Sequence, residues 1–322
     1  MHHKLNSSAR LLTGWLMVLI TINGCASWKP LEPVVYELQE WTSPEGITGV
    51  QLLTDHYDMR VTAKDELLRS YLPGFMETTF AKYCELMPPA GNNTDQLVIY
   101  LFDNRREWVN FTRIFAPQQA YTYLHIQSGG YTDYPSATAV IFDLGRDRTL
   151  SLMAHECFHQ YVARYFPEPM PAWLNEGLAT QWEAFDLKGD QPIYTPRKNY
   201  IRTNNLREAL YHGFIPWSEF LGMNAGHAVR KTGKDVRTYY AQVWSLILYL
   251  REGSDGMYAD RLAVLLADAG TERQSIAIRA YRAATEGSEN MSDGEALFRQ
   301  YITDDFDTFT ADYREYVRQL VY

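Results

Sequence analysis

The chain has 322 residues, of which 46% are hydrophobic and 21% charged, and its formal net charge at pH 7 is −9. This composition is typical of a globular protein, and the length suits one main domain with an appendage. The acidic balance, without a basic stripe, argues against nucleic acid as a partner.

Residues 1–24 have the features of a secretory signal peptide. Lys4 and Arg10 precede a short apolar run, Leu11–Ile22, and no acidic residue accompanies them. The run is too short to span a membrane comfortably but suits a signal-peptide core. Removal of Lys4 and Arg10 with this segment would change the net charge from −9 to −11.

Cys25 follows Gly24 at the end of the apolar run and precedes Ala26. This arrangement resembles a bacterial lipobox. The resemblance implies cleavage before Cys25, lipidation of that cysteine, and firm anchoring to a membrane by several acyl chains. Because residue 26 is not Asp, it also implies the outer membrane of a Gram-negative cell envelope, on the periplasmic or surface side. The alternative is an ordinary secretory signal cleaved near Ala26.

The mature chain is expected to comprise three parts. Residues 25–46 are rich in Pro and polar side chains and predict a tether. A catalytic domain is expected over residues 47–252, and a helical subdomain over residues 253–322, where apolar residues recur at helical spacing. Cys84 and Cys157 remain after Cys25 and could pair in an oxidising compartment. Their separation gives no pairing signal, so Cys157 is expected to be a small buried apolar residue, and whether the two cysteines pair is left open.

Strands and helices are predicted to alternate before the central motif. A weak strand is expected over Gly49–Val61 and an amphipathic helix over Thr62–Met87. Gln96–Phe102 is rich in β-branched and aromatic residues and predicts a strong strand. Ala116–Pro135 predicts a loop or hairpin near a cleft, and Ala137–Leu144 predicts another strand.

His155 to His159 reads H-E-x-x-H, which is the most informative motif of the chain. Residues i and i+4 share one face of a helix, so His155 and His159 can offer two imidazoles to one metal ion. Glu156 lies beside that face, where a carboxylate can take a proton from a zinc-activated water. The alternative is a metal-free helix with two structural histidines.

The surrounding pattern supports a helix around this motif. Apolar residues recur at helical spacing, and neither Pro nor Gly occurs between Thr149 and Phe166. Asp147 or Thr149 is available as the N-cap.

A second helix is predicted to supply the third metal ligand. Three prolines break the chain after the first helix, and a new helical pattern runs from about Trp173 to Phe185. Folding back would bring Glu176 to the two histidines. A catalytic zinc commonly takes two His and one Glu with an open position, so one Zn²⁺ per chain is expected. The same ligands also suit other divalent ions.

The segment Trp173–Glu183 resembles the W-L-N-E-G motif of the gluzincins, the aminopeptidase-N-like clan of zinc peptidases with its peptidase-MA-like group. The resemblance implies that Glu176 is the third ligand, that Glu156 activates water, and that a tyrosine on a later helix stabilises the oxyanion. Tyr239–Leu246 resembles a stretch of the peptidase-MA-like group, which points to Tyr240 as that donor, with Tyr239 as its neighbouring alternative.

Two further expectations follow from the resemblance. No G-x-M-E-N motif precedes the zinc helix, so aminopeptidase activity is not carried over. In this clan the strand before the zinc helix commonly forms the sheet edge, so Ala137–Val140 is expected to pair with an extended peptide, unless that strand is internal. His212 and His227 are weaker candidates for the oxyanion donor.

The sequence therefore predicts an α+β fold with a zincin-like core, in which a small mixed sheet and active-site helices precede a helical C-terminal part. The expected function is a membrane-anchored zinc metallopeptidase acting on peptides or proteins, with Glu156 as general base and Tyr240 as oxyanion donor. The alternatives are a non-catalytic envelope binding module and a hydrolase of a non-peptide cell-wall amide. The oligomeric state is left open.

Overall fold

The computed structural model describes residues 33–91, 93–126, 129–223 and 233–322. Val34–Tyr322 form one compact unit. The signal segment, Cys25 and His227 lie outside the described residues. Within the described ranges, no helix is long and apolar enough to cross a membrane.

A six-stranded mixed sheet has the strand order β1-β2-β3-β4-β6-β5. Its strands are β1 (Glu37–Thr42), β2 (Thr48–Leu53), β3 (Tyr57–Val61), β4 (Leu97–Phe102), β5 (Gly130–Asp133) and β6 (Thr138–Phe142). Strands β1, β2 and β3 are antiparallel neighbours, whereas β3, β4 and β6 are parallel and β5 returns antiparallel to β6. With the helices that follow, this sheet confirms the predicted α+β fold with a helical C-terminal part.

Two segments near the N-terminus differ from the prediction. Residues 49–61 contain the hairpin of β2 and β3 rather than one strand. Residues 37–42, expected within the tether, form strand β1. Most side chains of β1 are exposed, so the strand is held by its backbone pairing with β2 and carries no hydrophobic alternation. Its formation could not be inferred from the local pattern.

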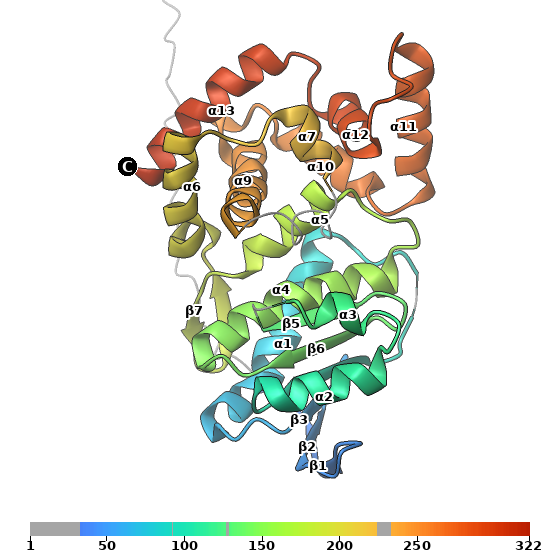
Figure 1. Cartoon of the computed structure of the whole chain (residues 1–322), viewed down its shortest axis with the longest axis vertical. Coiled ribbons are helices and arrows are strands. Elements are labelled where there is room, and N and C mark those ends of the chain that lie inside the picture. The colour runs from blue at the N-terminus through green and yellow to red at the C-terminus, as the bar shows by residue number, and fades with distance from the viewer. Residues whose placement is uncertain (1–32, 92, 127–128, 224–232) are drawn as a thin grey trace, which may run out of the picture. The chain divides into compact units, whose positions relative to one another are not determined.

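Side chains of β4 and β6 alternate between two hydrophobic cores, because successive residues of a strand point to opposite faces. One face lies in the same core as α1 (Glu66–Leu86) and α4 (Arg146–Tyr165). The other packs against α2 (Arg105–Phe115), whose Trp108 donates from Nε1 to the carbonyl oxygen of Val140 at 3.0 Å. Helix α4 consequently lies between the sheet and the C-terminal helices (Figure 1).

The prediction that Ala137–Val140 forms the edge of the sheet is wrong. Strand β6, which contains most of Ala137–Val140, is internal, and the short strand β5 occupies the sheet edge beside it. The chain between α2 and β6 contains the short helix α3 (Ala120–Tyr123) and then turns at Gly129, whose φ is +106°. The chain continues as β5 and then reverses into β6. Strand β5 thereby pairs with the side of β6 that would otherwise be the sheet edge.

The C-terminal part is helical, as predicted. Its elements are α5 (Ala172–Ala179), η1 (Thr180–Trp182), the hairpin β7 (Phe185–Lys188) and β8 (Gln191–Tyr194), η2 (Pro196–Lys198), α6 (Tyr200–His212), α7 (Trp217–Gly222), α9 (Gly233–Glu252), η3 (Ser254–Gly256), α10 (Ala259–Asp268), α11 (Glu272–Ala284), α12 (Asp293–Tyr301) and α13 (Phe306–Val321). The second motif helix therefore ends earlier than expected, because the chain tightens into η1 and Phe185 begins a strand.

Helices α5 and α9 approach each other closely at Gly177. A methyl group at this position would lie 2.7 Å from the Ile247 side chain and 3.0 Å from the backbone oxygen of Val243. Both distances are too short for an undisturbed carbon contact. Glycine therefore permits the spacing of the two helices at the residue that follows Glu176.

Candidate metal centre

Helix α4 begins at Arg146, so the predicted N-caps, Asp147 and Thr149, are wrong. Gly145 occupies the cap position with φ +91° and gives no side-chain cap. Oδ1 of Asp143 instead accepts from the Gly145 backbone N–H at 2.9 Å and from the Thr149 hydroxyl at 2.7 Å. These contacts fix the turn from β6 into α4, which sets the direction of the metal-binding helix.

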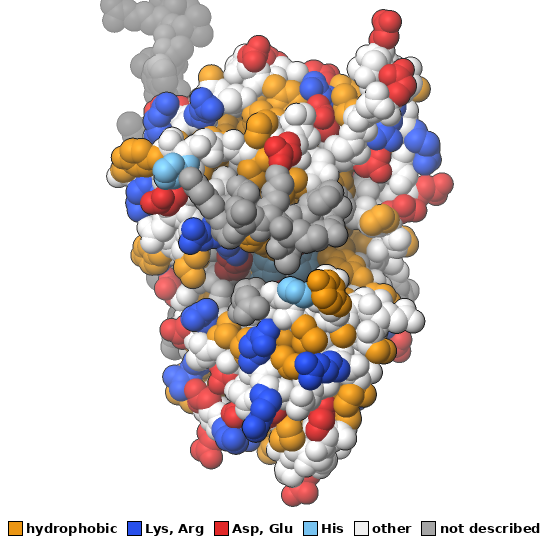
Figure 2. Space-filling model, viewed as in Figure 1, with side chains coloured by type: hydrophobic (Ala, Val, Ile, Leu, Met, Phe, Trp, Pro, Cys, Tyr) orange, Lys and Arg blue, Asp and Glu red, His pale blue; other side chains and the backbone are white. Residues whose placement is uncertain are grey.

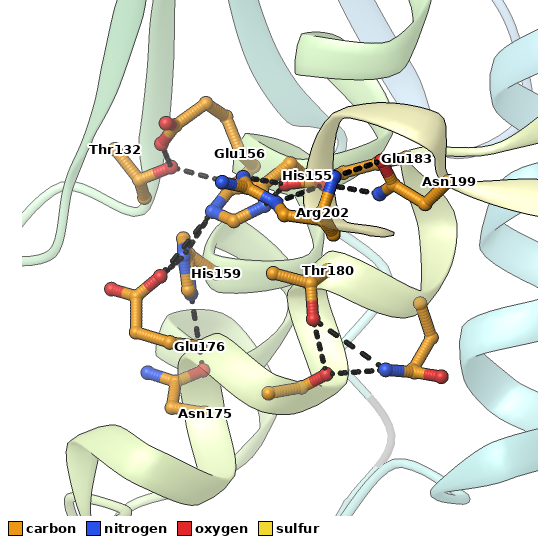
Figure 3. A network of polar contacts seen from close by, with 12 residues as sticks. Thr132, His155, Glu156, His159, Asn175, Glu176, Thr180, Glu183, Asn199 and Arg202 are labelled. Atoms are coloured by element: carbon orange, nitrogen blue, oxygen red, sulfur yellow. Dashed lines mark hydrogen bonds and ion pairs between the residues drawn. The ribbon is translucent and has the colours of Figure 1, made fainter. Parts of the chain in front are cut away.

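The three predicted ligands come together (Figure 3). His155 Nε2 lies 3.2 Å from His159 Nε2, and Oε2 of Glu176 lies 3.3 Å from the first and 3.4 Å from the second. All three residues are buried. The two histidines come from successive turns of α4, and Glu176 comes from α5, which packs against α4 after the proline-rich break.

These distances fit a metal ion. Ligand atoms at about 2.0–2.2 Å from a tetrahedral zinc lie about 3.3–3.6 Å from one another. Oε2 of Glu176 is buried and has no hydrogen-bond partner in the protein, although a buried carboxylate oxygen ordinarily needs one. A cation between the three atoms would satisfy it. In the described part of the chain, no fourth His, Cys, Asp or Glu joins the cluster.

The electrostatics of the cluster favour a positive charge at its centre. Burial lowers the pKa of His155, but the nearby carboxylates of Glu176 and Glu183 outweigh it and raise the pKa to about 10. Burial likewise raises the pKa of Glu176, yet the two histidines hold that pKa well below its usual range. The Glu176 carboxylate therefore stays ionised beside the two imidazoles, and its negative charge favours a cation at the centre of the cluster.

The outer nitrogens of both histidines are also bound. His155 Nδ1 donates to Oε1 of Glu183 at 3.0 Å, and His159 Nδ1 donates to Oδ1 of Asn175 at 3.1 Å. Asn175 Nδ2 in turn donates to the Tyr134 hydroxyl at 2.7 Å. In the neutral rings Nδ1 therefore carries the proton and Nε2 presents its lone pair to the cluster, which is the tautomer that a metal ligand needs.

Glu183 is held in place by α6 (Figure 3). Arg202 donates from Nε to Oε2 at 2.8 Å and from Nη2 to Oε1 at 2.5 Å, and Asn199 Nδ2 donates to Oε2 at 2.7 Å. Burial raises the pKa of Glu183, but Arg202 and His155 lower it to about 2. Glu183 therefore stays ionised and orients the His155 ring.

Glu156 lies next to the cluster and contacts the edge strand. The Thr132 hydroxyl on β5 lies 2.6 Å from the carbonyl oxygen of Glu156 and 3.1 Å from its Oε2. The two candidate oxyanion donors, Tyr240 and Tyr239, differ in their surroundings. The Tyr240 ring lies 6.2 Å from the His155 ring, whereas Tyr239 is fully buried against Phe220.

Two remaining predictions concern His212 and the two cysteines. His212 is half-exposed at the end of α6, with Glu208 at 3.7 Å. Cys157 is fully buried in the core, as expected, and Cys157 and Cys84 are both free cysteines. In the space-filling view, a hollow crosses the middle of this face, and histidine is visible within it (Figure 2).

Sequence reasoning assigned no role to Thr132, Glu183, Asn199 or Arg202. Glu183 belongs to the segment that resembles the gluzincin motif, so a signal for it was present. The other three carry no pattern of their own, because strand pairing and helix packing bring them to the site.

A search of known protein families finds none that matches this chain, and a search of curated proteins finds no match either. The buried triad, with its two histidines on one helix, is consistent, together with the mixed sheet, with a gluzincin-like site.

Proposed function

We propose that the protein is a zinc-dependent hydrolase that cleaves peptide bonds. The observation that carries this proposal is the buried cluster of His155, His159 and Glu176, with ligand atoms 3.2–3.4 Å apart and a carboxylate oxygen left without a hydrogen bond. Three protein ligands without a fourth among the described residues suit a catalytic zinc better than a structural one.

Each neighbouring side chain then has a role. Bound zinc would polarise a substrate carbonyl and lower the pKa of a water molecule to about 7. Glu156, whose Oε2 lies 3.1 Å from the Thr132 hydroxyl, would serve as the base that takes a proton from water and returns it to the leaving amine. Tyr240 donates a hydrogen bond to the developing oxyanion. Burial and the charge of Glu176 raise the pKa of Tyr240, so its hydroxyl keeps its proton at neutral pH.

The peptide class of substrate is supported by the sheet edge. Within the described ranges, β5 pairs with β6 alone and leaves its outer backbone groups without a strand partner. Thr132 on this strand contacts Glu156. An extended peptide added to β5 would therefore run beside the proposed general base.

We further propose that Cys25 carries lipid and holds the enzyme at the cell envelope, most simply at the outer membrane. The support is the arrangement of the N-terminal sequence alone. Mass spectrometry of the mature N-terminus tests it. A mature chain that begins after Cys25 and carries no lipid would contradict it.

The first experiment measures metal per chain by elemental mass spectrometry. About one zinc in the wild type, and none in His155→Ala, is expected. A screen of peptides and cell-wall fragments with Glu156→Gln as the control then tests hydrolysis. No metal after zinc is supplied would support the binding module instead, and cleavage restricted to cell-wall fragments would support the non-peptide amide.

A further inference from the structure

Arg202 contacts two groups of the proposed site at once. Its guanidinium edge makes two parallel hydrogen bonds to the Glu183 carboxylate. Its Cζ lies over the Tyr240 ring, 4.9 Å from the ring centroid. A planar guanidinium can do both, because its donors lie in its plane and its faces stack on aromatic rings.

These contacts form a closed ring of four side chains. His155 donates to Glu183, Glu183 accepts from Arg202, Arg202 lies over Tyr240, and the Tyr240 ring returns to His155 at 6.2 Å. The members come from α4, the segment after η1, α6 and α9. Arg202 thus joins the elements that carry a proposed metal ligand and the proposed oxyanion donor.

The start of α6 is built to hold Arg202 in this position. Asn199 caps the helix, since its Oδ1 accepts from the backbone N–H of Arg202 at 3.2 Å. Nδ2 of the same side chain donates to Glu183. The Glu183 carboxylate therefore faces both a guanidinium and the positive end of a helix. Only 17% of the Arg202 side chain is exposed, so water competes little for these contacts.

We propose that Arg202 is a positioning residue that couples the orientation of metal ligand His155 to the placement of Tyr240. This inference rests on the proposed function. Arg202 holds the carboxylate that orients His155 and supports the ring that carries the oxyanion donor. In the described part of the chain, no hydrogen bond or ring contact joins Glu183 directly to Tyr240. Arg202 contacts both of these residues and therefore links them directly.

Arg202→Lys tests the geometry while it keeps the positive charge. Lysine cannot form the two-pronged contact and stack on the ring together. We expect zinc affinity, measured by competition with a chelator, to fall about 10- to 100-fold, which is typical for loss of a ligand's outer partner. We also expect the absorption bands of the cobalt-substituted protein to shift, because the His155 ring turns. Both readouts are independent of catalysis.

A double-mutant cycle tests the link to Tyr240. If Arg202 acts on the donor, Arg202→Lys should reduce kcat less in the Tyr240→Phe background than in the wild type. Tyr240→Phe alone should leave zinc affinity unchanged. The inference would be overturned if the two substitutions reduced kcat independently, so that their fold-effects multiplied in the double mutant. It would also be overturned if Arg202→Lys left the zinc affinity and the cobalt spectrum unchanged.

Arg60 provides the matched control. It donates from Nη2 to Asp58 at 2.8 Å, and its Cζ lies 5.3 Å from the Tyr100 ring centroid, so it makes the same kinds of contact within the sheet. Arg60→Lys should leave zinc affinity and kcat unchanged. Equal effects of both substitutions would mean that Arg202 contributes only general stability, and would contradict the proposal.

A second variant covers a folding defect in Arg202→Lys. Glu183→Gln combined with Arg202→Gln removes both charges together, so no unpaired ion stays buried. It should fold, bind zinc more weakly than the wild type, and lose the kcat coupling to Tyr240. Wild-type zinc affinity in this variant would refute the proposal. A wild type that binds no zinc would refute the proposed function itself, which is a different result.

Discussion

The Thr132 hydroxyl on edge strand β5 lies 3.1 Å from Oε2 of Glu156 and 2.6 Å from the carbonyl oxygen of the same residue. One side chain therefore ties the proposed substrate-binding edge to both the backbone and the carboxylate of the proposed general base. The helix and the sheet cannot shift relative to each other here without breaking this contact.

Thr132→Val should lower kcat with little loss of stability. The substitution keeps the shape but removes a hydroxyl contact of about 1 kcal/mol, which corresponds to about a fivefold change in rate. Thr132→Ser restores the hydroxyl and should recover most of the rate. Steady-state kinetics on one peptide substrate measure both variants. Equal loss in both variants would assign the effect to packing.

Glu156→Gln should retain zinc and lose hydrolysis. The amide has nearly the same size but cannot take a proton, and loss of a general base commonly costs about 10²- to 10⁴-fold. Metal content and turnover are measured on the same preparation. A zinc-loaded variant with full activity would remove Glu156 from the mechanism.

Tyr240→Phe should lower kcat about 100- to 1000-fold, the usual effect of one lost oxyanion donor. Tyr239→Phe is its matched control. The Tyr239 hydroxyl is buried without a hydrogen-bond partner, so its removal should leave activity unchanged and stability equal or higher. If the two variants exchange these behaviours, Tyr239 is the donor.

Removal of the metal should lower the melting temperature. Binding of an ion to the folded state alone stabilises it by about 2.7 kcal/mol at a 100-fold excess over Kd. Differential scanning calorimetry before and after chelation checks this, and one equivalent of zinc should restore the original value. The His155→Ala/His159→Ala variant should not respond to zinc. A wild type that melts at the same temperature with and without zinc would argue against binding.

The pair of His56 and Glu77 predicts a pH-dependent contribution to stability. The hydrogen bond to Glu77, at 2.6 Å, raises the pKa of His56 against the opposing effect of burial. Burial raises the pKa of Glu77, but His56 outweighs it and lowers the pKa. The histidine contribution is complete below 6.5 and is lost as pH rises through the raised pKa. The glutamate contribution is complete above 4.5 and is lost as pH falls through the lowered pKa.

The difference in unfolding free energy between wild type and Glu77→Gln should therefore be largest between pH 4.5 and 6.5. It should shrink on both sides of this window. Denaturant titrations at several pH values measure it. A difference that grows above the window would contradict the assigned pairing.

The metal cluster could be predicted from sequence because its information is local. His155 and His159 are one helical turn apart, and the prolines after the helix require a break that brings Glu176 back. The sheet edge could not be predicted in this way. Strand β5 has four residues, and its pairing with β6 depends on the whole hairpin rather than on a hydrophobic period.

The side chains that surround and orient the cluster could also not be predicted from local sequence patterns. Glu183, Asn199 and Arg202 meet because β7 and β8 form a hairpin that places the start of α6 beside the end of η1. Strand β1 shows the same limit, since an exposed strand held by backbone pairing has no distinctive side-chain pattern.

Gly177 is not a ligand, but it affects the spacing of the candidate metal centre through the distance between α5 and α9. Because a methyl group here would lie 2.7 Å from the Ile247 side chain and 3.0 Å from the backbone oxygen of Val243, an alanine requires Ile247 or the two helices to move, and Glu176 is the adjacent residue. A shift of α5 would change the separation of the three ligand atoms. The spacing of the ligand atoms, and with it the size of the ion that fits, therefore depends on the lack of a side chain at the point where α5 and α9 cross.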